Sequence, residues 1–325
     1  MPFLPVGGQA VIEGVMMRSP SRVAVAVRHA DGSLAFMERP FSSVTRRVRA
    51  LGLPVVRGAV SLFETLYLGI TALNFSADEA TRDEETSRAA VPGAAGAGPA
   101  AAARPSRWHG AAQILTVAFS LGLGILMFVV LPARLTGWLG FHDRIGFGLV
   151  DGFFRLLAFI LYLLLISQWK ELARVLGYHG AEHKAIHALE NGAPLTPESV
   201  QSFPRLHPRC GTSFLFLVVV ISVVAFTFIG RPNGVGDHLL RIACMPLIAG
   251  VAFEFIRLSG RYADRPIVRW LVWPGLQFQR LTTREPDLSM CAVAIAALER
   301  VRQDEMVVAL QARGADARAE VAFVQ

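Results

Sequence analysis

Four long apolar runs constrain the fold of this 325-residue chain more than any other feature. They cover residues 111–131, 147–168, 213–230 and 238–258. Each run is close to the ~20 residues that an α-helix needs to cross about 30 Å of hydrocarbon. The mean hydropathy of +0.45 and the hydrophobic content of 53% agree with this assignment. The sequence therefore predicts a mainly α, polytopic membrane protein with about four transmembrane helices and the lipid bilayer as its solvent.

The residues before the first run predict a small module that contains β-structure. From Arg22 to His29, valine and alanine alternate along the chain. Asp31-Gly32 follows, and this dipeptide supplies the positive φ of a tight hairpin turn. We therefore assign residues 1–50 to an N-terminal module built on a β-hairpin.

Two segments of different character connect this module to the first run. Residues 51–80 form an apolar helix interrupted by Arg57 and Glu64, which share one face because they lie two helical turns apart. We expect an interfacial or re-entrant helix here, and a transmembrane helix with a buried charged face is the alternative. Residues 81–107 contain mainly Ala, Gly, Pro and charged residues, so they cannot offset their ordering entropy by burial. They predict a disordered linker.

The distribution of basic residues predicts the orientation of the chain. The net charge is +7, yet the loops 132–146 and 231–237 hold few arginines and no lysine. The N-terminal region, the loop 169–212 and the tail 261–325 hold nearly all the others. The positive-inside rule then places both termini and the loop 169–212 in the cytoplasm. The transmembrane domain spans residues 108–260, and the cytoplasmic tail contains a helix over residues 289–310.

The basic balance also bears on partners. Anionic lipid headgroups account for it in a chain with several spans, and we expect no nucleic acid. Three cysteines do not make a disulfide framework and fit a reducing compartment.

A histidine-rich segment between the second and third runs predicts a metal site. His179 and His183 lie at i and i+4 on one helical face, and Glu182 precedes the second histidine. This H-x-x-E-H order is the inverted zincin pattern, in which two imidazoles hold Zn²⁺ and the glutamate is the general base. A second pair, His207 and Cys210, follows about two dozen residues later and resembles zinc-ligand spacing.

The residues leave three interpretations of this segment open. If both histidines of the motif bind together with His207 and Cys210, the zinc site is closed and structural. A catalytic site instead needs three protein ligands and a water, with Glu182 as base and Arg209 stabilising a developing oxyanion. In the third interpretation the histidines, with His187 continuing the row, form only a polar face next to the membrane.

Four strings in the chain resemble the YqhQ-like bacterial membrane proteins, a family of unknown function described as predicted metal-dependent enzymes. The strings are GGQAVIEGVMMRSP at 7–20, YHGAEHK at 178–184, HPRCGTSFL at 207–215 and PGLQFQRLTTREP at 274–286. The resemblance implies a bacterial cytoplasmic membrane protein with a candidate metal site at the residues given above. It implies no substrate.

Two functions from different classes follow as hypotheses. The first is a zinc-dependent hydrolase of unknown substrate at the cytoplasmic face of the membrane. The second is a non-enzymatic scaffold or assembly factor in which a structural metal fixes the loop 169–212, with an unknown protein partner. A channel or transporter ranks last because four spans are few and carry little charge, unless the chain forms a homo-oligomer.

Overall fold

The computed structural model describes residues 6–89, 107–141, 143–208, 210–262 and 265–302. Its contacts divide the chain into two compact units. The first unit combines residues 1–83, 163–218 and 246–325, and the second combines residues 84–162 and 219–245. Segments far apart in sequence therefore assemble each unit.

A four-stranded antiparallel sheet forms the N-terminal part of the first unit. Its strands β1 to β4 follow one another in space as in sequence: Gly7–Val11, Gly14–Arg18, Arg22–Arg28 and Leu34–Pro40. The predicted hairpin is confirmed as β3 and β4, whose turn contains Gly32 at a φ of +88°. The glycine-flanked string before it, residues 7–20, supplies the other two strands, which its sequence pattern did not predict.

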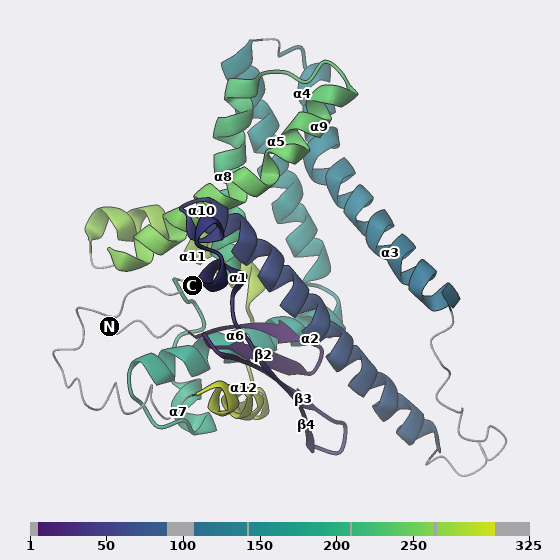
Figure 1. Ribbon diagram of the computed structural model, residues 1–325, viewed down its shortest axis with the longest axis vertical. Helices are drawn as coiled ribbons and strands as arrows, with labels where there is room; N and C mark the ends of the chain where they lie inside the picture. The colour runs from purple at the N-terminus through teal and green to yellow at the C-terminus, as the bar shows by residue number, and fades with distance from the viewer. Residues whose placement is uncertain (1–5, 90–106, 142, 209, 263–264, 303–325) are drawn as a thin grey trace. The chain divides into compact units, whose positions relative to one another are not determined.

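The two faces of the sheet pack against different helices, because side chains alternate across a strand. Val23, Val25 and Val27 lie on the face that packs against Ala72 of α2 (Val56–Ala89). The opposite face contributes its buried residues to a core with α6 (Lys170–Glu190) and α12 (Leu288–Val301). The sheet is therefore covered on both sides by helices of the same unit (Figure 1).

The remaining helical elements complete the chain. They are α1 (Val44–Arg47), the 3₁₀ turn η1 (Arg49–Gly52), α3 (Arg107–Ile125), the π-helical turn η2 (Leu126–Val130), α4 (Leu131–Trp138), α5 (Arg144–Ile166), α7 (Pro197–Gln201), α8 (Gly211–Ile229), α9 (Val235–Ala243), α10 (Met245–Arg261) and α11 (Pro266–Thr282). Helix α12 supplies the predicted helix of the tail, and residues 303–325 lie outside the described residues.

Five segments among the described residues are long and apolar enough to cross a membrane. They are Val56–Arg88, Leu115–Trp138, Arg144–Ile166, Gly211–Ile229 and Val235–Ser259. The last four correspond to the predicted runs, so the class of polytopic α-helical membrane protein is confirmed. The first is the least apolar, with a mean hydropathy of 1.2 against 1.9 to 2.6 for the others.

Helix α2 extends further than the sequence predicts. It continues to Ala89, so Thr81 to Ala89 are helical rather than part of a disordered linker. The reason is a tertiary contact that composition cannot reveal: Glu79 is buried and Asp83 accepts a hydrogen bond from the His29 ring at 2.6 Å. The rest of the predicted linker, 90–106, lies outside the described residues.

Buried charges connect the helices of the second unit. The Arg155 guanidinium donates to the Asp151 carboxylate at 2.9 Å and to two carbonyl groups of the π-helical turn η2. Arg241, which is fully buried, donates to the same carboxylate at 3.5 Å and to the Gly230 carbonyl at 2.6 Å. Burying charge is costly unless it is paired, so these three side chains hold α5, α9 and η2 together.

Replacement of Gly180 by alanine should destabilise the first unit. A Cβ at Gly180 would lie 2.1 Å from the carbonyl oxygen of Arg284, which is backbone and cannot swing away. Overpacking of this kind costs about 1–3 kcal/mol, so the thermal unfolding midpoint of the purified protein should fall by several degrees. Gly211→Ala is the matched control, since a Cβ there meets nothing within 4 Å. Equal effects of the two substitutions would contradict the prediction.

Candidate metal centre

Helix α6 positions a row of three histidines. His179, His183 and His187 follow one another at intervals of four residues, and the first two rings have centroids 4.5 Å apart. The helix is buried here because the sheet and α12 pack against it. Lys184 of the same helix donates to the carbonyl groups of Gln201 and Phe203, each at 2.7 Å. The row therefore lies on a rigid element.

The segment before α8 brings the second predicted pair to this row. Gln279 of α11, fully buried, holds the segment: its amide accepts from the His207 N–H at 2.8 Å and donates to the His207 carbonyl at 2.6 Å. The same amide donates to Ser213 at 2.9 Å. Because Gln279 makes these three bonds, it fixes Cys210 at the start of α8 opposite the histidines.

Three of the four predicted ligands converge on one point. The donor atoms of His179, His183 and Cys210 all lie within 4.8 Å of one another. His179 Nε2 and Cys210 Sγ are 3.2 Å apart. Zinc binds such donors at about 2.0–2.1 Å for nitrogen and about 2.3 Å for sulfur. The distances between the three donor atoms therefore suit a single ion.

Backbone carbonyl groups fix the tautomer of both imidazoles. The Nδ1 atom of His179 lies 2.7 Å from the Thr282 oxygen, and that of His183 lies 2.6 Å from the Arg205 oxygen. A carbonyl oxygen can only accept, so each Nδ1 carries the proton and each Nε2 presents a lone pair. The Nε2 of His183 is buried and has no hydrogen-bond partner. A metal ligand explains an atom that would otherwise lose its hydration without compensation.

Glu182 lies beside these donors. Its carboxylate is 3.6 Å from His183 Nε2 and 4.0 Å from His179 Nε2. Burial raises the pKa of Glu182 to about 7, although His179 and the Gly8 N–H, which donates to it, act in the opposite direction. Gly8 of β1 must be glycine for this approach, because a Cβ would lie 2.5 Å from the Met16 oxygen and 2.9 Å from Glu182 Cγ.

The fourth predicted ligand belongs to a neighbouring group. His207 lies with His187 and Glu190, and the donor atoms of these three residues are also within 4.8 Å of one another. The His207 ring centroid is 4.5 Å from that of His187 and 5.7 Å from that of His183. Burial, helped by His183, lowers the pKa of His207 to about 3, so its ring is neutral. Three of the predicted ligands therefore lie in one group, and His207 lies in the other.

Sequence reasoning missed the residues that hold the site together. Gln279 and Thr282 lie in the string at 274–286, which was recognised without any role, and Gly8 lies in the string at 7–20. Glu190 is at the end of the same helix as the histidine row and has only its spacing from His187 as a signal. The predicted stabiliser Arg209 lies outside the described residues.

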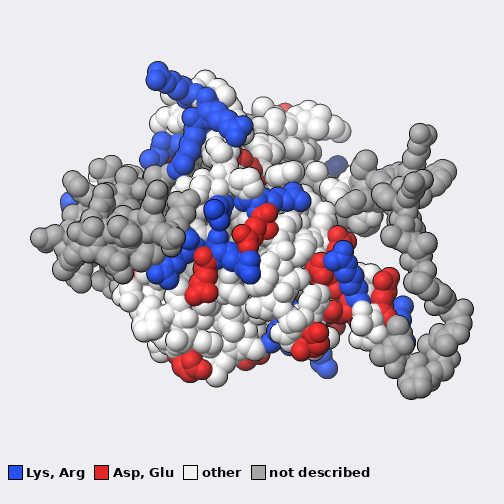
Figure 2. Space-filling view, turned by 60° about the horizontal axis from the view of Figure 1, so that its bottom comes forward, with Lys and Arg blue, Asp and Glu red and all other residues white. Residues whose placement is uncertain are grey.

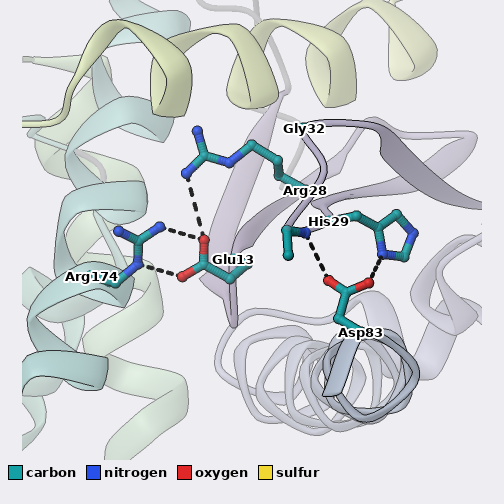
Figure 3. A pocket seen from close by; sticks show the side chains of 7 residues that line it. Glu13, Arg28, His29, Gly32, Asp83 and Arg174 are labelled. Carbon is teal, nitrogen blue, oxygen red and sulfur yellow. Dashed lines mark hydrogen bonds and ion pairs between the residues drawn. The ribbon is translucent and has the colours of Figure 1, made fainter. Parts of the chain in front are cut away.

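A second polar region on this unit is a cavity of about 370 Å³ (Figure 3). Glu13, at a φ of +50°, points into it and binds Arg174 of α6 through both carboxylate oxygens, with Arg28 3.6 Å away. Asp83 of α2 accepts from the His29 ring on the other side of the cavity. Basic and acidic side chains also lie next to one another at the centre of the face in Figure 2. The first pair connects the turn between β1 and β2 to α6, and the second connects α2 to the residue after β3.

The comparisons with known proteins show the family. Residues 53–304 match the family of proteins of unknown function DUF1385. The chain belongs to this family. It is also 30% identical over 299 residues to the uncharacterized protein YqhQ of Bacillus subtilis (strain 168), with 89% of each chain covered. No solved structure matches. The DUF1385 match includes every candidate ligand and Glu182, and it begins after the four strands.

The raised pKa of Glu182 gives a pH-dependent prediction for the metal-free DUF1385 chain. The carboxyl group ionises at about pH 4.5 in the unfolded chain and at about pH 7 in the folded one. The free energy of unfolding therefore falls as the pH rises through this range. Glu182→Gln cannot ionise, so this variant should unfold roughly 2–6 °C above the unmodified protein at pH 8, and the difference should shrink at pH 5. Thermal unfolding in a chelator is the measurement. The exposed Glu171→Gln is the control, and a pH-independent difference for Glu182→Gln would contradict the prediction.

Proposed function

We propose that this DUF1385 protein binds one zinc ion through His179, His183 and Cys210 and acts as a hydrolase at the membrane surface. The observation that carries the proposal is the buried Nε2 of His183, which has no hydrogen-bond partner and lies among donors within 4.8 Å of one another. Two imidazole nitrogens and one thiolate suit zinc better than the harder cations, which prefer oxygen.

The donor set supports a catalytic role because it contributes three ligands. Zinc with three protein ligands keeps a position for water and supplies the Lewis acidity that activates it. Glu182 is held by the Gly8 N–H within 4.0 Å of both imidazoles, so its carboxylate can accept a proton from a water between them. In the zinc deaminases a His/Cys donor set is likewise paired with a glutamate that is not a ligand. We retain Arg209, one residue before Cys210, as the proposed stabiliser of negative charge.

The proposal includes the sidedness of the site. The loop 169–212 and the segments at both ends of the chain carry most of the arginines, which favours the cytoplasmic side of a bacterial membrane. The contacts of the sheet with α6 and α12 support one compartment for all three. The substrate is then a molecule that reaches the cytoplasmic face of the bilayer.

A structural metal in a non-enzymatic scaffold is the second candidate, and His207 is the observation that favours it. Its ring centroid lies 5.7 Å from that of His183, so a modest movement of the segment before α8 would bring a fourth ligand to the ion. The two hydrogen bonds between the Gln279 amide and the His207 backbone, which we call the Gln279 clamp, oppose this movement. The two candidates differ in whether the ion keeps an exchangeable position.

Zinc content tests the site itself. The purified protein should contain about one zinc per chain, because the three donors form a single group. His183→Ala removes a central ligand and should reduce the content to near zero. His29→Ala is the matched control and should retain the metal, because His29 follows β3 and contacts Asp83 instead of the three donors. Loss of zinc in both variants, or none in the unmodified protein, would refute the site.

Cobalt substitution tests the open position. The cobalt-loaded protein should have the absorption of a four-coordinate site, and small anions such as azide should change it by replacing water. Glu182→Gln should keep the cobalt spectrum while losing any hydrolytic activity, since Glu182 is not a ligand. A spectrum that does not respond to anions would favour the closed site with His207 instead.

A further inference from the structure

Helix α2 has one buried face and one exposed apolar face. Ala72 packs on the sheet, and Ser76 and Glu79 of the same helix are also buried. Its exposed residues form an apolar stripe at helical spacing on the other side: Phe63, Leu66, Tyr67, Ile70 and Leu73. Tyr67 is 65% exposed and Phe63 59%, so nothing in the described part of the chain covers the stripe.

Polar contacts hold α2 along the sheet over the length that a span would need. Glu64 pairs with Arg18 of β2 at 3.7 Å, and Asp83 binds the ring of His29, which follows β3, at 2.6 Å. Glu79 lies 3.6 Å from the same histidine. The helix between Glu64 and Asp83 is about 28 Å long, close to the hydrocarbon thickness of a bilayer. A helix attached in this way to an open β-sheet cannot also pass through lipid.

The path of the chain leads to the same conclusion. The sheet packs on α6, so both lie in one compartment. Three segments that could cross a membrane separate them in sequence: α2, the α3–α4 segment and α5. Three crossings would place α6 on the opposite side of the membrane from the sheet. An even number is required, and α2 is the least apolar of the three.

The start of α2 places the stripe at the bilayer. Gly58 lies so close to Gly250 of α10 that a Cβ on it would be 2.9 Å from the Gly250 Cα. Arg57 donates to Glu254 of the same helix at 2.6 Å. Because α10 belongs to a candidate span, α2 begins against a transmembrane helix.

The residues before α2 suit lipid headgroups. Arg46, Arg47 and Arg49 are exposed, and the neighbouring Val44 and Val48 are also exposed. Basic side chains next to exposed apolar ones are typical of segments that lie in the headgroup region.

We propose that α2 lies along the surface of the bilayer on the same side as the sheet, with the Phe63–Leu73 stripe in the lipid, and does not cross. Lipid of the leaflet on this side of the membrane covers the stripe. The four more apolar segments then cross, and this assignment is independent of whether a metal binds.

Protease sites in the full-length protein test the sidedness. One site is placed at the N-terminus, a second in the exposed turn at Asn191-Gly192, and a third at Gly140 between α4 and α5. In membrane vesicles of one orientation the first two should be cut together, and the third only in vesicles of the other orientation. Cleavage of the first and second sites in opposite orientations would overturn the proposal.

Spin labels test the position of the stripe in lipid nanodiscs. Phe63→Cys, Leu66→Cys, Ile70→Cys and Leu73→Cys should all give labels accessible to oxygen, at similar shallow depths. The unmutated protein gives the background from its own cysteines, and Asp31→Cys in the exposed β3–β4 turn is the control accessible to a water-soluble nickel reagent. A crossing helix would instead change depth by about 15 Å between positions 63 and 73. Labels shielded from both reagents would show that protein, including a second copy of the chain, covers the stripe, and would also overturn the proposal.

Discussion

The candidate centre depends on two hydrogen bonds between imidazole rings and backbone carbonyl groups. Thr282 and Arg205 accept from His179 and His183, and each bond turns an Nε2 lone pair toward Cys210. These carbonyls come from segments on opposite sides of α8 in sequence. The two imidazoles therefore take this arrangement only when the loop before α8 and the end of α11 are both in place.

The clamp on His207 extends this dependence to the membrane helices. Gln279 is an uncharged residue at the centre of the clamp, and an amide can donate and accept at once without the desolvation cost of an ion. It also reaches Ser213 in the first turn of α8. The candidate ligand Cys210 directly precedes α8, so the position of its thiol depends on the position of this helix.

The sequence predicted what depends on local patterns. Apolar runs gave the spans, the valine–alanine alternation gave a hairpin, and H-x-x-E-H placed two imidazoles on one face because that spacing fixes geometry within a helix. It could not divide four ligands between two groups, since the assignment of His207 depends on Gln279, 72 residues away. Nor could it assign Gly8, whose role is a close approach to a carboxylate far along the chain.

Strand β1 connects the candidate metal centre with helix α2. Its Gly8 donates to Glu182 on one side, while the side chain of the next residue, Gln9, lies against Gly69 of α2 so closely that a Cβ there would be 2.9 Å from its amide nitrogen. A helix held by lipid and a buried carboxylate thus contact adjacent residues of one strand. The depth of α2 in the leaflet then fixes how far the Glu182 carboxylate lies from the bilayer. In a fragment that lacks α2, this distance would no longer be fixed. The placement favours a substrate that is presented at the membrane surface.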